Sequence, residues 1–251
     1  MKKLIAFDLD DTLAITKSPI TDQMAEVLAQ LADYFEVCII SGGKFEQFKN
    51  QVIDRLEISE DKLTKFHLMP TCGTRYYKFD LSKNDWSLVY AEDLNQQQKK
   101  LIIDSLKQAA TELGYWEEKP YGDIIEDRGS QITFSALGQN APADMKYVWD
   151  PDSAKRFAIR DYLAPKLEGL EIRVGGTTSI DVTLAGIDKA YGMKKIIEFL
   201  GIKKSEILFF GDRLQPGGND YPVQMFGIDC LEVSKWQDTV LALKAILHVC
   251  D

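Results

Sequence analysis

Apolar runs and helical periodicity alternate along the first fifty residues. Residues 4–9 and 37–40 are short, nearly continuous apolar runs, and such runs predict buried strands. A helix is predicted between them, because apolar side chains recur every three or four positions, at Met24, Val27, Leu28, Leu31 and Phe35. A second helix is expected after residue 43, through Phe45, Phe48 and Val52. This order of strands and helices predicts a parallel sheet with helices on both faces.

The pattern changes between residues 82 and 186. Three segments alternate as strands do (86–90, 131–135 and 179–183), and helical stretches at 94–113 and 152–163 separate them. Such grouping is typical of an α+β module with an antiparallel sheet. The first pattern then resumes with a helix that Gly201 ends, a strand at 207–210 and a closing helix. We therefore predict an α/β fold, in which a doubly wound parallel-sheet core (residues 1–81 and 187–251) carries an inserted α+β cap (residues 82–186).

Composition and charge exclude several classes of protein. The 251 residues are 45% hydrophobic and 27% charged, which is ordinary for a globular protein. The chain has 30 Lys and Arg against 39 Asp and Glu, and its net charge of −9 disfavours nucleic acid as a partner. No apolar run approaches the roughly 18 residues of a membrane span, and no export signal is visible. We expect a cytoplasmic protein without a membrane partner.

Acidic side chains follow two of the predicted strands. Asp8 and Asp10 come at the end of the first, and Asp212 and Asp220 follow the strand at 207–210. Open parallel sheets build their sites where strands end, and four converging carboxylates repel one another unless a cation lies among them. Oxygen ligands suit Mg²⁺, which commonly accompanies phosphate. The pattern predicts a Mg²⁺-dependent phosphoryl-transfer site.

The spacing of Asp8 and Asp10 would allow the two carboxylates to take different roles in one reaction. Residues two apart in extended chain point the same way, so one carboxylate could attack phosphorus while the other handles the proton of the leaving group. Thr12 could donate a hydrogen bond to the phosphate or to Asp8. The alternative is a strand that simply ends in acidic surface residues.

Ser41-Gly42-Gly43 follows the second strand and opens a helix. A small hydroxyl beside free backbone N–H groups, including that of Gly42, suits a phosphate oxygen. An ordinary turn is the alternative. Lys189, where the core resumes, could neutralise both the phosphate and a nucleophilic carboxylate, although it is one of 30 basic residues.

The glycine-rich segment 211–220 permits a tight loop that brings Asp212 and Asp220 back to one point. Asp212 would bind the metal directly. Asn219 and Asp220 would hold Lys189 or metal-bound water. A surface turn of Gly, Asn and Pro is again the alternative.

In this order the motifs resemble those of the haloacid dehalogenase superfamily. Asp8 and Asp10 match its first motif, Ser41 its second, Lys189 its third, and Asp212 with Asp220 its fourth. The insertion resembles the type IIB cap of sugar-phosphate phosphatases. Residues 210–221 and 175–182 are most similar to the eukaryotic-type phosphomannomutase family.

The resemblance implies a role for each matched residue. Asp8 would be the nucleophile that forms an aspartyl-phosphate, and Asp10 the general acid and then base. Mg²⁺ would be held by Asp8, the backbone carbonyl of Asp10, and Asp212. In the cap, Arg128, Ser179 and Asp181 match positions that in the family grip the distal phosphate or the sugar hydroxyls, so they would bind the substrate here. Pairing through the caps, as in that family, implies a possible homodimer.

The chain departs from the mutases at three positions. Gln139 stands where they carry an arginine, and Lys146 where they carry a further arginine. Glutamine cannot grip phosphate bidentately as arginine does. Asp11 replaces the usual glycine of the first motif, which would add negative charge near the site. These departures favour a Mg²⁺-dependent phosphatase acting on a small sugar phosphate. The alternatives are a phosphomannomutase or phosphoglucomutase primed by a bisphosphate, and a non-catalytic sugar-phosphate sensor.

Overall fold

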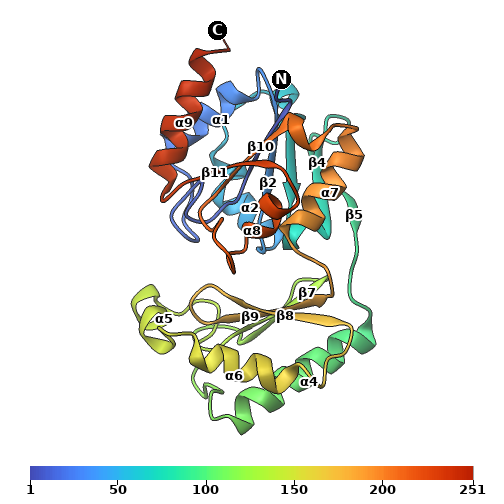
Figure 1. Ribbon diagram of the computed structural model, residues 1–251, viewed down its shortest axis with the longest axis vertical. Coiled ribbons are helices and arrows are strands. Elements are labelled where there is room, and N and C mark those ends of the chain that lie inside the picture. The colour runs from blue at the N-terminus through green and yellow to red at the C-terminus, as the bar shows by residue number, and fades with distance from the viewer. Residues whose placement is uncertain (251) are drawn as a thin grey trace. The chain divides into compact units, whose positions relative to one another are not determined.

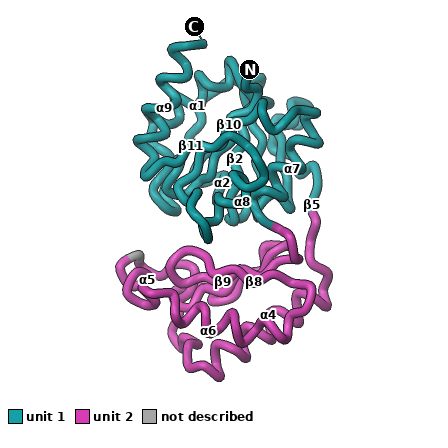
Figure 2. The backbone as a smooth tube through the Cα atoms, in the orientation of Figure 1, with its two compact units in different colours: residues 1–91, 188–251 teal, residues 92–187 magenta. Residues whose placement is uncertain are grey.

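The computed structural model describes residues 1–250, which form two compact units. One unit comprises residues 1–91 and 188–251, and the other comprises residues 92–187 (Figure 2). The chain therefore leaves the first unit once and returns to it once. None of the helices within residues 1–250 combines the length and the apolar character needed to cross a bilayer.

The first unit is built on a seven-stranded sheet in the order β11-β10-β1-β2-β3-β4-β5 (Figure 1). Its parallel part consists of β1 (Leu4–Phe7), β2 (Glu36–Ile40), β3 (Phe66–Met69), β10 (Ile207–Gly211) and β11 (Asp229–Glu232). Two antiparallel strands extend it at one edge, β4 (Arg75–Asp80) and β5 (Asp85–Ala91).

Helices cover both faces of this sheet, because its central strands are apolar on both sides. Ile5 and Phe7 of β1 belong to a core cluster with α1 (Asp22–Leu31), α2 (Phe45–Gln51) and α9 (Trp236–His248). Leu4 and Ala6 belong to a second cluster with α7 (Lys189–Leu200) and α8 (Tyr221–Met225). The short helix α3 (Glu60–Leu63) precedes β3. The continuous apolar runs in the sequence thus reflect burial on two faces.

The second unit has a four-stranded antiparallel sheet in the order β6-β7-β9-β8. The strands are β6 (Ile125–Asp127), β7 (Gln131–Ser135), β8 (Leu170–Gly175) and β9 (Ser179–Leu184). Alternate side chains of β7 and β9 form a core cluster with α4 (Gln96–Glu112) and α6 (Ala154–Leu163). A further helix, α5 (Ala143–Trp149), lies between β7 and α6 in the sequence. The opposite face of the sheet presents polar side chains, because neighbouring residues of a strand point to opposite faces.

The predicted fold class agrees with this architecture, but the predicted limits of the insertion do not. We expected the second unit to begin at residue 82 and to contain a strand at 86–90. That segment is β5, which pairs with β4 from Arg75↔Ala91 to Asp80↔Asp85 and so belongs to the first unit. The alternation predicts a strand there without identifying its partner. The connection of only four residues makes β4 the nearest strand for β5 to pair with.

Candidate active site

The candidate site lies at the carboxyl ends of three adjacent strands, β10, β1 and β2. Phe7 of β1 is in register with Phe210 of β10 and with Ile39 of β2. The residues that follow these strands therefore emerge at one edge of the sheet. The backbone N–H of Asp8 continues the pairing by donating to the Phe210 carbonyl at 2.9 Å.

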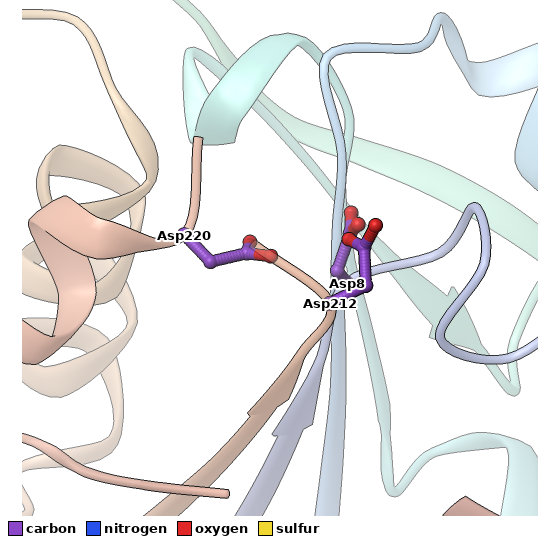
Figure 3. Close-up of side chains that lie close together, drawn as sticks. All are labelled: Asp8, Asp212 and Asp220. Atoms are coloured by element: carbon purple, nitrogen blue, oxygen red, sulfur yellow. The ribbon is translucent and has the colours of Figure 1, made fainter. Parts of the chain in front are cut away.

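Three carboxylates gather at this edge. One oxygen each of Asp8, Asp212 and Asp220 lies within 4.8 Å of the others (Figure 3). Lys189, the first residue of α7, places its Nζ 2.6 Å from Asp8 Oδ1 and 2.5 Å from Asp220 Oδ1. Its side chain is 1% exposed. The structure thus brings together four of the predicted residues, which lie up to 212 positions apart in the chain (220 − 8).

Asp220 is held on both of its oxygens. Oδ1 contacts Lys189 Nζ, and Oδ2 accepts a hydrogen bond from the backbone N–H of Arg213 at 3.1 Å. The carboxyl group lies against Gly211, where a Cβ would be only 2.6 Å from Asp220 Cγ. Gly211 therefore makes room for Asp220. Asp8 contacts Lys189 through Oδ1 alone, and Asp212 lies 3.5 Å from Arg213 Nε. Asn219 lies in the same loop and is exposed.

Burial and crowding raise two carboxyl pKa values. The pKa of Asp8 lies well above its ordinary value, because burial and the nearby Asp220 and Asp212 outweigh the effect of Lys189. Burial and Asp220 likewise raise the pKa of Asp212. The two carboxylates raise the pKa of Lys189 despite its burial, so this side chain stays protonated.

The donor set fits a hard divalent cation. Lys189 contacts Asp8 and Asp220, and the half-exposed Arg213 lies with Nε 3.5 Å from Asp212 Oδ2. Three carboxylates against two cations leave the cluster with excess negative charge when it is fully ionised. Asp8 and Asp212 offer oxygen ligands, which Mg²⁺ prefers. A cation between them would offset the repulsion that raises their pKa values.

The Asp10 carboxylate lies outside this cluster and is bound by the helix after β2. Its Oδ2 accepts from Gln47 Nε2 at 3.0 Å, and its Oδ1 accepts from Gln51 Nε2 at 3.2 Å. The backbone N–H of Lys17 also donates to Oδ1, at 2.8 Å. Sequence reasoning missed the two glutamines. They are four residues apart, and therefore on one face of the helix that follows Ser41-Gly42-Gly43; this spacing was the signal in the sequence.

Asp11 serves the loop that follows the first motif. Its backbone is left-handed, with φ of 62°, a conformation that glycine adopts freely and aspartate tolerates. Its two carboxylate oxygens accept from the backbone N–H and the hydroxyl of Thr16, at 3.2 and 2.7 Å. The negative charge that we expected it to add near the site is therefore bound within its own loop.

Ser41 and Thr12 lie at the ends of β2 and β1. The Ser41 hydroxyl accepts from the backbone N–H of Gly43 at 3.2 Å. A Cβ at Gly42 would meet no atom within 4 Å, so the loop is open there. Thr12 is 0% exposed, and within residues 1–250 its Oγ1 has no hydrogen-bond partner. A buried hydroxyl without a partner is uncommon, so Thr12 has a hydrogen-bonding capacity that the described part of the chain does not use.

The second unit carries the remaining predicted residues. Ser179 and Asp181 lie on the polar face of β9, where Asp181 Oδ1 accepts from the Thr133 hydroxyl at 2.7 Å. The hydroxyl oxygens of Ser179 and Ser135 are 3.3 Å apart. Arg128 donates through Nε to Glu126 at 2.7 Å.

Gln139 and Lys146 lie together. Lys146 Nζ donates to the Gln139 backbone carbonyl at 2.9 Å. Gln139 Nε2 is buried and has no hydrogen-bond partner in the described part of the chain. The two positions at which the family resemblance led us to expect arginines therefore hold one amide and one ammonium group.

A buried arginine that sequence reasoning missed supports the turn before Ser179. Arg156 Nε lies 2.7 Å from Asp150 Oδ2, and Arg156 Nη1 donates to the Gly175 carbonyl at 3.2 Å. This pair anchors the β8–β9 turn to the start of α6. In the sequence, Arg156 resembles any other basic residue on a helix.

Known proteins resemble the chain along most of its length. The family model for eukaryotic phosphomannomutase matches residues 24–249. Phosphomannomutase 1 of Dictyostelium discoideum is 28% identical over 227 residues, which cover 86% of this chain and 84% of that protein. Phosphomannomutase of Saccharomyces cerevisiae is 27% identical over 235 residues, covering 88% and 84%. A haloacid dehalogenase-like hydrolase from Bacteroides thetaiotaomicron matches in structure, with a TM-score of 0.67 at 15% identity, covering 98% of this chain and all of that one.

Proposed function

The chain belongs to the eukaryotic phosphomannomutase family, and from that premise we propose that it transfers the phosphoryl group of a small sugar phosphate to Asp8. The resemblance predicted from the motifs is confirmed at the level of family and fold. The chain is accordingly an enzyme of the haloacid dehalogenase phosphotransferase kind. The family match begins at residue 24, so the role of Asp8 is supported chiefly by its contact with Lys189, which lies 2.6 Å away.

In the proposed first step, one bond to phosphorus forms, another breaks, and one proton is transferred. An Asp8 carboxylate oxygen attacks phosphorus, and the bond between phosphorus and the sugar oxygen breaks, leaving its electron pair on that oxygen. The departing oxygen takes a proton from Asp10. Lys189 offsets negative charge on Asp8 and the phosphoryl group, and the hydroxyls of Ser41 and Thr12 bond phosphoryl oxygens. In the second step, an incoming hydroxyl gives its proton to Asp10 and takes the phosphoryl group from Asp8.

Mg²⁺ is the proposed metal. Asp8, Asp212 and the backbone carbonyl of Asp10 would hold it, while Asp220 remains bound to Lys189. When bound, the ion supplies positive charge to the phosphoryl oxygens.

The incoming hydroxyl decides between two outcomes. A sugar hydroxyl makes the enzyme a mutase, and water makes it a phosphatase. The sequence led us to favour the phosphatase, but the family match and the named relatives favour the mutase. We therefore take phosphomannomutase activity as the first candidate.

Hydrolysis is the second candidate, supported by the amide of Gln139 and the bond between Lys146 and the Gln139 carbonyl. A mutase must hold a sugar bisphosphate in either of two orientations, and a glutamine grips a phosphate less firmly than an arginine. The non-catalytic sensor has the least support, because Asp8, Lys189, Asp212 and Asp220 are all present and assembled.

Phosphorus NMR separates these outcomes. The purified protein is mixed with Mg²⁺, mannose 1-phosphate and a catalytic amount of glucose 1,6-bisphosphate. A growing 6-phosphate signal supports the mutase, and inorganic phosphate without it supports the phosphatase. Asp8→Asn, which is similar in shape but less nucleophilic, should abolish either signal. Activity that survives in Asp8→Asn would contradict the proposed mechanism.

A further inference from the structure

The Asp10 carboxylate is held on both oxygens by donors from two separate segments. Gln47 and Gln51 reach it from α2, and the backbone N–H of Lys17 reaches it from the loop after β1. An aspartate side chain has two torsions, and donors on both oxygens restrict both of them. Carboxamides are also neutral, so they orient Asp10 without the positive charge of a lysine or arginine.

Gln51 joins Asp10 to the neighbouring loop. Its side chain is buried, at 2% exposed, and Nε2 donates to the Ser18 carbonyl at 2.7 Å as well as to Asp10. Its own backbone carbonyl accepts from the N–H of Ile20 at 2.8 Å. Gln51 therefore fixes the loop after the first motif against α2, and Asp10 with it.

Gln47 reaches Asp10 through space that a glycine leaves open. A Cβ at Gly43 would lie 2.1 Å from Gln47 Oε1, so any larger residue there would displace the amide. The same glycine donates its N–H to the Ser41 hydroxyl at 3.2 Å. The expected phosphate loop and the support of Asp10 thus share one residue.

We propose that Gln47 and Gln51 are positioning residues that fix the orientation of Asp10 for proton transfer to the leaving sugar oxygen. This inference rests on the proposed function, in which Asp10 protonates that oxygen as its bond to phosphorus breaks. Small displacements of such a group cost large factors in rate. Loss of either amide should therefore slow reactions that need the proton and spare those that do not.

The test compares two leaving groups in a single turnover. Mannose 1-phosphate releases a sugar oxygen that needs a proton, whereas p-nitrophenyl phosphate releases a phenolate that is stable without one. The variants are Gln47→Met and Gln51→Met, which keep the side-chain length and remove the hydrogen bond. Asn50→Leu is the matched control, because Asn50 is an exposed amide of the same helix. Rates of Asp8 phosphorylation are measured by rapid quench and by the nitrophenolate burst.

Each glutamine variant should lower the mannose 1-phosphate rate about 10- to 100-fold, a part of the 10²- to 10⁴-fold that acid catalysis typically supplies. The nitrophenolate burst should change less than about threefold, since it needs no acid. Asn50→Leu should change neither rate. Equal slowing of both substrates, or of neither, would overturn the inference. Gln47 is only partly buried, so Gln47→Met decides the question alone if Gln51→Met does not fold.

Failure of the proposed function would look different. If the wild-type protein and Asp8→Asn released nitrophenolate at the same rate, the covalent mechanism itself would be refuted, and the positioning role of the glutamines with it. A normal burst without leaving-group discrimination in the variants would refute the positioning role alone.

Discussion

Replacing Lys189 by methionine should destabilise the first unit strongly. Methionine has nearly the same length but no charge, so the change leaves Asp8 and Asp220 buried without their cation. Lys189 Nζ lies 2.6 Å from one carboxylate and 2.5 Å from the other. Within residues 1–250, no other positively charged side chain contacts both carboxylates.

Removing one partner of a buried ion pair typically lowers the free energy of unfolding by about 3–5 kcal/mol. Because Lys189 serves two buried carboxylates, we expect a loss of about 4 kcal/mol in the free energy of unfolding. Whole domains are stable by only about 5–15 kcal/mol. Excess Mg²⁺ should restore part of the loss, since a cation on Asp8 and Asp212 replaces some of the missing charge.

The double variant Lys189→Met/Asp220→Asn provides the internal control. Removing the Asp220 charge as well should recover stability relative to Lys189→Met, with a coupling of at least about 1 kcal/mol. Urea unfolding is followed by hydrogen exchange of peptides from β1 and β10. These report on the first unit alone, whereas tryptophans are present in both units.

Two outcomes would refute this reasoning. A loss of less than about 1 kcal/mol in Lys189→Met would mean that the carboxylates do not depend on this lysine. Additive effects in the double variant would mean that Lys189 and Asp220 are not coupled despite their contact.

Two further predictions concern other parts of the first unit. The pKa of Glu36 is lowered to about 2, because hydrogen bonds from His67 and Lys65 outweigh the opposing effect of burial. Burial lowers the pKa of His67. Both groups therefore stabilise the fold above their unfolded pKa values of 6.5 and 4.5, and stability should fall as the pH drops below 6.5 and again between 4.5 and 2. Glu36→Gln should flatten the lower part of this curve in urea titrations, and an unchanged curve would contradict the assignment. Gly211→Ala should reduce phosphoryl transfer at least about tenfold, because a 1 Å displacement near a reacting group can cost about 100-fold. Steady-state rates unchanged from wild type would show that Asp220 accommodates the methyl group.

The sequence was sufficient for the core and for most of the candidate site. Short apolar runs identify strands buried on two faces, and acidic residues at their ends indicate the edge at which they meet. Asp8, Asp212 and Asp220 could be predicted to converge because every parallel strand carries its following residue to the same edge.

Other features depend on contacts that a one-dimensional pattern does not contain. The alternation of residues 86–90 predicts a strand but does not choose between two sheets. Gln47 and Gln51 look like the polar side of an ordinary helix, and only the folded chain shows that Asp10 lies beside them. The role of Arg156 was equally hidden in the sequence, because its partner Asp150 and the turn at Gly175 become neighbours only after folding.

The positions at which the second unit is inserted have an evolutionary consequence. The chain departs after Ala91 and returns at Asp188, so the residues of the assembled carboxylate cluster and its lysine all lie outside the inserted segment. Recombination between relatives could exchange residues 92–187 as one block without altering that cluster. The downstream crossover must fall before Asp188, because its carboxylate accepts from the N–H of Tyr191 at 2.8 Å and begins the helix that carries Lys189. The inserted unit can therefore be inherited as one module, and Asp188 marks its downstream limit.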